Sequence, residues 1–149
     1  MKPKPFTILL VDDDPDCRSL AREALAQAYP CCDIREVANG VDALAFLHKE
    51  GPHAEAPGVD LVYLDIEMPG LLGQEVLKLI QLDPDLRSIP VIILTGLEDE
   101  ALVAEAMADG ASGFAQKPVE SKSFANSILI AGRPWLGPVG PVGPVGLSP

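Results

Sequence analysis

The stretch DLVYLDIEMPG, residues 60–70, places an acidic residue at the end of an apolar segment. Residues 59–64 are mostly apolar and lack strict alternation with polar residues, which is typical of a strand covered on both faces of a parallel sheet. Asp65 comes where this strand should end, and Glu67 and a Met-Pro-Gly turn follow it. The sequence therefore predicts a buried strand that holds a carboxylate at its carboxyl end.

Four other segments have strand character, and helical patterns lie between the strands. Strands are expected at 7–11, 33–38, 59–64, 90–95 and 112–116. A first helix is expected from Pro15, after the cap residue Asp14, with apolar positions that recur to Ala28. Further helices are expected over 40–49, 72–82 and 98–109, and Gly110 marks the end of the last of these. A final helix is expected from after Pro118 to about Ala131. Strand and helix alternate five times, which predicts an α/β fold with a parallel sheet, right-handed crossovers and helices on both faces.

The composition and net charge of the chain limit the classes of protein to which it can belong. The chain has 149 residues, 48% of them hydrophobic, and a net charge of -11. This predicts one folded domain and argues against nucleic-acid binding, because phosphates are neutralised by Lys and Arg. Residues 1–6 lack the apolar region of a signal peptide, and no apolar run approaches the ~18 residues of a membrane span. Cys17, Cys31 and Cys32 lack metal-type spacing, so free thiols of a reducing cytoplasm are expected.

Two segments stand apart from the repeated strand-helix pattern. Residues 48–58 are rich in Pro and Gly and predict a surface loop, with His48 and His53 in solvent. We expect residues 1–131 to form the domain and residues 132–149 to be a Pro/Gly-rich tail without an output domain. The tail contains three G-P-V triplets, too few for a collagen helix, so an extended or flexible chain is expected.

The ends of the predicted strands carry a set of residues with a common chemistry. Ligands of open α/β sheets bind beyond the carboxyl ends of the strands, where this chain places Asp12, Asp13, Asp65, Thr95 and Lys117. Carboxylate oxygens favour Mg2+ or Mn2+ over zinc. A carboxylate beside such a metal can attack a phosphoryl group and form an aspartyl phosphate. A hydroxyl and an ammonium placed opposite can hold the other phosphoryl oxygens.

Four motifs, ILLVDDDPD, DLVYLDIEMPG, VIILTG and FAQKP, together resemble the receiver domain of two-component response regulators. Thr95 lies 30 residues after Asp65, and Lys117 lies 22 residues after Thr95, as in that family. The resemblance covers about residues 6–131. It implies a doubly wound, flavodoxin-like (βα)5 fold with a five-stranded parallel sheet in the order 2-1-3-4-5.

The resemblance also implies roles at the acidic end of the sheet. Asp65 would accept a phosphoryl group from a phosphohistidine of a sensor histidine kinase. Asp13 and Asp65 would bind Mg2+ by their side chains, Asp12 through water, and Glu67 by its backbone carbonyl, with Mn2+ as a possible substitute. Glu67 and Leu97 occupy the two positions that tune phosphate lifetime, and neither offers an amide to orient water, so slow to moderate self-dephosphorylation is expected.

Further roles follow from the resemblance at the later strands. Thr95 and Lys117 would bind phosphoryl oxygens, and the bond before Pro118 is often cis in the family. Phe114 matches the aromatic switch position, whose ring turns inward when the Thr95 hydroxyl moves toward the phosphate. The alternative for Phe114 is ordinary core packing.

With no output domain expected, the signal should leave through the last two helices and the edge strand between them. Consecutive apolar residues at the end of the last helix cannot all face the core, so homodimerisation through this helix and the tail is expected, the alternative being a tail that folds back. The residues concerned are Ile128, Leu129, Ile130, Trp135 and Leu136. The segments 50–65 and 82–95 and a Trp-Leu tail resemble a subgroup of small stand-alone regulators, often paired with bacterial phytochrome kinases. The G-P-V repeats depart from that subgroup.

Four other functions compete with a phosphoaccepting signal protein that is not an enzyme. The chain could act as a phosphate sink or as an intermediate that passes phosphate onward. A Mg2+-dependent phosphohydrolase of the haloacid-dehalogenase type also uses a strand-end aspartate, but it has a D-x-D-x-T pattern on its first strand, where this chain has D-D-D-P-D. A scaffold without phosphoacceptor chemistry would not need the complete set of site residues.

Overall fold

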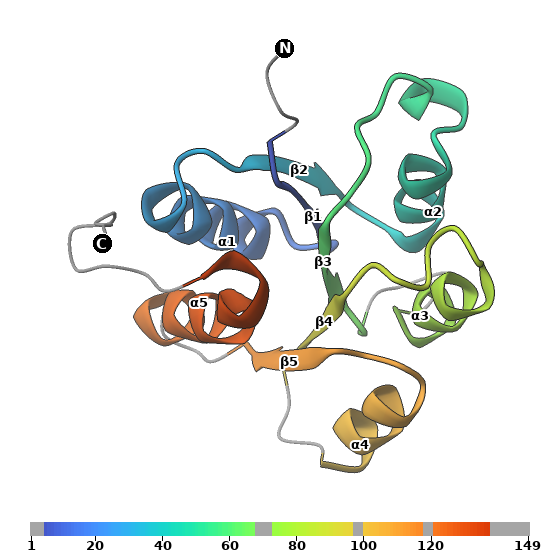
Figure 1. Cartoon of the computed structure of the whole chain (residues 1–149). Helices are drawn as coiled ribbons and strands as arrows, with labels where there is room; N and C mark the ends of the chain where they lie inside the picture. The colour runs from blue at the N-terminus through green and yellow to red at the C-terminus, as the bar shows by residue number, and fades with distance from the viewer. Residues whose placement is uncertain (1–4, 68–72, 97–99, 118–120, 138–149) are drawn as a thin grey trace.

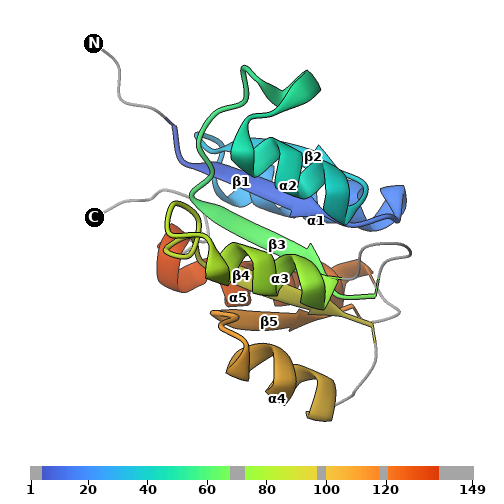
Figure 2. The same cartoon turned by 90° about the vertical axis from the view of Figure 1, so that its right-hand side faces the viewer.

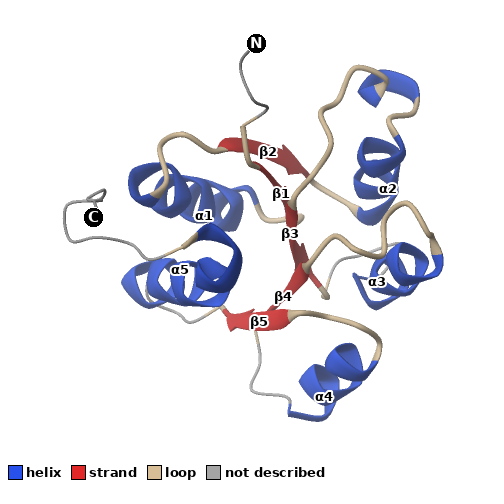
Figure 3. Cartoon of the chain, in the orientation of Figure 1, coloured by secondary structure: helices blue, strands red, loops and turns tan. Residues whose placement is uncertain are grey.

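The protein is described from a computed structural model that places residues 5–67, 73–96, 100–117 and 121–137. The strands are β1 (Thr7–Val11), β2 (Asp33–Val37), β3 (Leu61–Asp65), β4 (Val91–Thr95) and β5 (Gly113–Gln116). The α-helices are α1 (Pro15–Ala28), α2 (Gly40–His48), α3 (Gly73–Leu82), α4 (Glu100–Ala108) and α5 (Ser121–Leu136). Strands and helices alternate along the chain as the sequence predicts (Figure 3).

The five strands form one parallel sheet in the order β2-β1-β3-β4-β5. Helices α1 and α5 cover one face, and α2, α3 and α4 lie on the other side (Figures 1 and 2). The predicted doubly wound fold and strand order are confirmed. Since every strand points the same way, all five carboxyl ends meet at one edge of the sheet.

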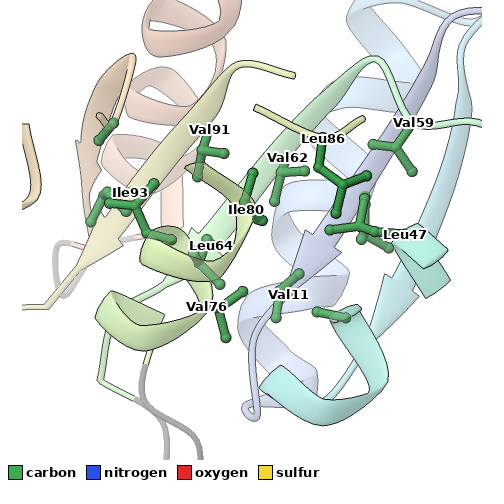
Figure 4. Close-up of a cluster of buried hydrophobic side chains, with 14 of the residues drawn as sticks. Val11, Leu47, Val59, Val62, Leu64, Val76, Ile80, Leu86, Val91 and Ile93 are labelled. Atoms are coloured by element: carbon green, nitrogen blue, oxygen red, sulfur yellow. The ribbon is translucent and has the colours of Figure 1, made fainter. Parts of the chain in front are cut away.

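Alternate residues of the central strands enter two hydrophobic clusters, one on each face of the sheet. Val11, Val62, Leu64, Val91 and Ile93 pack against α2 and α3 in the first cluster (Figure 4). Their neighbours along the strands face α1 and α5 in the second cluster, which includes Ile8, Leu10, Leu61, Tyr63, Ile92 and Leu94. Burial on both faces explains why these strands lack a polar alternation.

The last helix is longer than the sequence predicts. It continues past Ala131 to Leu136, with Pro134 inside its final turn. The buried Tyr63 hydroxyl donates to the carbonyl of Ile128 at 2.7 Å. At Gly132 a Cβ would lie 2.2 Å from that hydroxyl, so glycine lets the helix pass close over β3. Because these contacts are tertiary, local sequence pattern did not reveal them.

The segment between α2 and β3 is also more ordered than a plain loop. A 3-10 helix spans Gly51–His53, and the His53 ring lies 5.2 Å from the Phe46 ring. His53 is therefore half-buried, which differs from the solvent position that the sequence predicts. His48 is exposed, as predicted, and its Nε2 lies 2.8 Å from Asp83 Oδ2.

Two predicted helix signals are confirmed. The Asp14 carboxylate accepts a hydrogen bond from the Asp16 N–H and caps α1, and Gly110 has the positive φ of 109° expected after α4. The three cysteines all lie in the described ranges and are free thiols. None of the described helices combines the length and the apolar character needed to cross a membrane.

Candidate functional site

Backbone hydrogen bonds continue the sheet at the carboxyl ends of its five strands. The Asp12 N–H donates to Val37 O at 3.2 Å, and the Lys117 N–H donates to Thr95 O at 2.7 Å. On β3, the residue after Asp65 donates from its N–H to Leu94 O at 3.2 Å. These bonds bring residues that are far apart in the sequence to one edge of the sheet.

Helix α3 begins directly against the end of β3. A Cβ at Gly73 would lie 2.3 Å from the backbone oxygen of Asp65 and 2.5 Å from the Cα of Ile66. Since backbone atoms cannot move aside cheaply, the packing requires glycine at this position. The start of α3 thereby fixes the backbone that carries the Asp65 carboxylate.

Three aspartates form an acidic cluster at this edge. One carboxylate oxygen from each of Asp12, Asp13 and Asp65 lies within 4.8 Å of the others. Asp12 and Asp65 are each 2% exposed, whereas Asp13 is exposed. The Lys117 ammonium lies 2.7 Å from Asp12 Oδ2 and 3.0 Å from Asp65 Oδ2. The predicted acids and lysine are therefore brought together.

The close packing changes the proton affinities of this group. Burial raises the pKa of Asp12, and hydrogen bonds from Lys117 and the Asp14 N–H oppose that rise. Burial alone would lower the pKa of Lys117, but its hydrogen bonds and ion pairs with Asp12 and Asp65 outweigh burial and raise this pKa above its ordinary value. Lys117 is consequently a permanent cation at neutral pH.

The donor set of the acidic cluster fits a hard divalent cation. Three carboxylates face one ammonium, so among the described residues Lys117 pairs with only part of the negative charge of the cluster. All the candidate ligand atoms are oxygens, which suit Mg2+ or Mn2+. A cation at Asp12, Asp13 and Asp65 would therefore relieve repulsion that Lys117 balances only in part.

Glu67 links the ends of β3 and β4. Its N–H donates to Asp65 Oδ1 at 2.9 Å. Its carboxylate Oε1 accepts hydrogen bonds from the Gly96 N–H at 3.2 Å and from the Thr95 hydroxyl at 3.4 Å. Thr95 is 1% exposed, whereas Glu67 is exposed. The side chain of Glu67 thus accepts hydrogen bonds from one hydroxyl and one N–H beside the acidic cluster.

The aromatic switch and dimer residues that the sequence predicts lie outside the acidic cluster and differ in their exposure. Phe114 is 51% exposed on β5, so the alternative of core packing for this ring is wrong. Leu97 and Pro118 lie outside the described residues. Of the proposed dimer surface, Ile128 is fully buried and belongs to the core, while Ile130 is 62% exposed.

Leu129, Trp135 and Leu136 are partly buried against the cluster on the α1 and α5 face. Ile128 was wrongly assigned to the surface because Tyr63 and Gly132 draw this part of the helix onto the sheet.

Two contacts at the site were missed by the sequence patterns. Glu67 was expected to bind a cation by its backbone carbonyl and to tune phosphate lifetime, but its carboxylate was not expected to accept from Thr95 and Gly96. Arg18 donates from Nη1 to the backbone oxygen of Asp12 at 2.6 Å. A signal existed for Arg18, because helical side chains point back toward the amino end and Arg18 is one turn after the cap.

This strand order, with its functional residues at the carboxyl edge, defines a doubly wound α/β protein of the flavodoxin-like type. The sequence profile of the response regulator receiver domain matches residues 8–129. The chain therefore belongs to the response regulator receiver family, as the four motifs indicated.

Similar proteins include phytochrome-associated regulators. Response regulator Rcp1 of Synechocystis sp. is 35% identical over 96 residues, 64% of this chain and 65% of Rcp1. The Mn(2+)-bound form of Rcp1 has a TM-score of 0.83 and 29% identity, over 91% of this chain and 98% of that one. The phosphorylated cyanobacterial phytochrome response regulator RcpA has a TM-score of 0.83 and 29% identity, over 90% and 96%.

The bacteriophytochrome response regulator AtBRR has a TM-score of 0.73 and 31% identity, covering 87% of this chain and 94% of that chain. This chain spans less than two thirds of the length of the first curated relatives. The share is 65% for Rcp1, 23% for a probable cyclic di-GMP phosphodiesterase of Vibrio cholerae and 29% for the regulator RpfG of Xanthomonas campestris.

Proposed function

We propose that this protein accepts a phosphoryl group on Asp65 from a sensor histidine kinase in a Mg2+-dependent reaction. The observation that carries the proposal is the buried Asp65 carboxylate, held at a strand end with Lys117 at 3.0 Å and two further aspartates within 4.8 Å. A nucleophile needs such a rigid support. In the reaction, a carboxylate oxygen of Asp65 bonds to phosphorus as the bond from phosphorus to the histidine nitrogen breaks.

The other site residues have complementary roles in the proposed reaction. Asp12, Asp13 and the backbone carbonyl of Glu67 would hold the cation, which neutralises charge on the transferring group when bound. Lys117 would bind a phosphoryl oxygen and keep its contact with Asp12. The Thr95 hydroxyl would bind another oxygen, which requires it to leave the Glu67 carboxylate.

Transmission of the signal is proposed for the face formed by α4, β5 and α5. Phe114 is half exposed on this face, which leaves its ring free to turn inward once the Thr95 hydroxyl moves. Homodimerisation would use Ile130, the exposed member of the apolar residues on α5. The buried Ile128 takes no part.

The partner and the setting are inferred from the relatives. RcpA is a phytochrome response regulator and AtBRR a bacteriophytochrome response regulator. We therefore propose a bacterial phytochrome kinase as the donor and the cytoplasm as the compartment. We also propose that Glu67 and Leu97 give slow to moderate loss of the phosphate, and a half-life of seconds in Mg2+ would contradict this.

Acetyl phosphate tests the phosphoacceptor function without knowledge of the kinase. The full chain is incubated with acetyl phosphate and Mg2+, and its intact mass is measured. We expect one added phosphate in the wild type and none in Asp65→Asn, which keeps the side-chain shape but not the nucleophile. An adduct that persists in Asp65→Asn would assign the phosphate elsewhere, and no adduct in the wild type would contradict the function.

Further incubations separate the alternatives. Given a phosphomonoester and Mg2+, a phosphohydrolase would turn over many equivalents, whereas we expect no steady turnover. A sink or relay intermediate would pass its phosphate back to a kinase or to a further phosphotransfer protein. Transfer from candidate kinases, compared by rate, would identify the partner.

A further inference from the structure

We propose that Arg18 is a positioning residue for the metal-binding acids. The proposal rests on the metal-dependent function proposed above and adds to it a residue outside the acidic cluster. Arg18 lies on α1, and its Nη1 donates to the backbone oxygen of Asp12 at 2.6 Å. The side chain is 18% exposed, so its guanidinium is not a freely moving surface group.

The bonded carbonyl has a special place in the chain. It belongs to the planar peptide that joins Asp12 to Asp13, two of the three acids in the cluster. Fixing this peptide plane restricts how the two side chains are oriented relative to each other. A contact to one backbone oxygen therefore acts on both carboxylates without touching either.

Arg18 is itself anchored on the sheet. Its Nε lies 3.1 Å from Glu36 Oε1, and Glu36 is on β2. The Asp12 N–H also donates to Val37 O on β2. The peptide groups on both sides of Asp12 are thus tied to the edge strand, one directly and one through the Arg18–Glu36 pair.

Arg22 provides a matched comparison within the same helix. It also pairs with Glu36, through the other carboxylate oxygen. Its Nη2 donates to the backbone oxygen of Ile34 at 2.6 Å, near the start of β2 and away from the acidic cluster at the other end of the strand. Arg18 and Arg22 therefore share an ion-pair partner and differ in which backbone carbonyl they hold.

Charge and positioning make opposite predictions for removal of Arg18. Loss of a positive charge near the acids should strengthen binding of a metal cation by Coulomb attraction. Loss of a residue that orients the ligands should weaken it, and such supporting contacts typically account for tenfold or more in metal affinity. The sign of the change therefore distinguishes a positioning role from a general electrostatic one.

The test is Mn2+ affinity, measured from the electron paramagnetic resonance signal of free Mn2+ in titrations of the full chain. We expect Arg18→Met to raise the dissociation constant about tenfold. Arg22→Met should leave it unchanged, while both variants lose similar thermal stability. Arg18→Gln, which is too short to reach both Glu36 and Asp12, should behave as Arg18→Met and serves if the methionine variant does not fold.

An unchanged or lower dissociation constant in the Arg18 variants would overturn the proposal. So would an equal loss in Arg22→Met, since that would assign the effect to the α1–β2 contact as a whole. A wild-type chain that binds no Mn2+ would contradict the metal-dependent function and the role of Arg18 with it. A wild type that binds Mn2+ but takes no phosphate would contradict only the phosphoacceptor function, and the affinity comparison would still decide the role of Arg18.

Discussion

An aspartate stands at each end of β3, and the two carboxylates are held in different ways. Asp60, just before the strand, accepts through Oδ2 from the Thr7 N–H at 2.8 Å, and its own N–H donates to Thr7 O at 2.8 Å. Asp65, at the other end, is bonded by the Glu67 N–H of its own loop and by the Lys117 ammonium. The backbone partner of Asp60 cannot leave without breaking the sheet, whereas a lysine side chain can rearrange.

This difference separates a structural acid from the proposed phosphoacceptor on a single strand. Both residues occupy comparable sites at a strand end, so residue type alone does not assign them. Their bonding partners distinguish them, because the Lys117 side chain can rearrange when Asp65 changes its bonds, whereas the backbone partner of Asp60 cannot. The predictions below change these partners one at a time.

The largest expected effect on stability comes from the movable partner, Lys117. In Lys117→Met, the buried carboxylates of Asp12 and Asp65 lose their counter-charge, which should lower the free energy of unfolding by about 3–5 kcal/mol. Urea denaturation without metal measures this change. Lys78→Met removes an exposed lysine from α3 and should change stability little. Equal stability of the two variants would mean that Lys117 does not balance buried charge.

The stability that a bound metal adds should depend on the acidic cluster at the Asp65 end of β3 and not on Asp60. At about a hundred times its dissociation constant, a cation that binds only the folded state stabilises it by about 2.7 kcal/mol. Thermal unfolding with and without Mn2+ measures this gain in the wild type. Asp13→Asn should lose most of it, because it removes one ligand of the cluster. Asp60→Asn should keep it, and loss of the gain in Asp60→Asn would erase the contrast between the two ends.

Removal of the structural acid should cost stability without affecting the chemistry. Asp60→Ala takes away the acceptor of the buried Thr7 N–H, which should lower the free energy of unfolding by about 1–3 kcal/mol. Asp60→Asn retains an acceptor oxygen and should cost less. The acetyl phosphate adduct, measured well below the melting temperature, should form in both variants. A folded Asp60→Ala chain that forms no adduct would show that this acid also supports the reaction.

The smallest effect is expected at Asp83, an acid on the surface. The hydrogen bond from His48 lowers the pKa of Asp83, and the Asp85 N–H adds to this. Since the folded-state pKa is depressed, this stabilisation is present above the ordinary pKa of 3.8 and is lost as the pH falls through the folded value. His48→Gln should lower the melting temperature by at most about 2 °C at neutral pH. The difference should shrink as the pH falls below 3.8 and Asp83 becomes protonated, and a difference that grows over that range would contradict the assignment.

Much of the fold was predictable because burial on both faces leaves a strong mark on the sequence. The run 7–11 became β1 without change, and Asp14 and Gly110 bounded their helices as expected. The acids, Thr95 and Lys117 followed from the rule that parallel strands end at one edge. These features depend on local pattern and on topology, both of which a single sequence contains.

The errors involve side chains that meet across the fold. Gly132 and Pro134 indicate the end of a helix by local preference, but Tyr63 makes glycine a requirement there, and α5 continues. Ile128 looked like part of an exposed apolar run until the Tyr63 hydroxyl fixed its carbonyl over the sheet. The contacts of Glu67 with Thr95 and Gly96 likewise join residues whose spacing in the sequence gives little warning.

The continuation of α5 also determines what the one tryptophan of the chain can report. Trp135 lies in the last turn of α5 and is partly buried with Leu136 against the cluster on that face. The helix begins at Ser121, near Lys117, and at about 1.5 Å per residue its last turn lies about 20 Å further along the axis. Tyr29 of α1 donates its hydroxyl to Gly137 O at 2.6 Å just beyond it. Intrinsic tryptophan emission is therefore a built-in probe for docking of the helix end, separate along the helix from the proposed phosphoacceptor site.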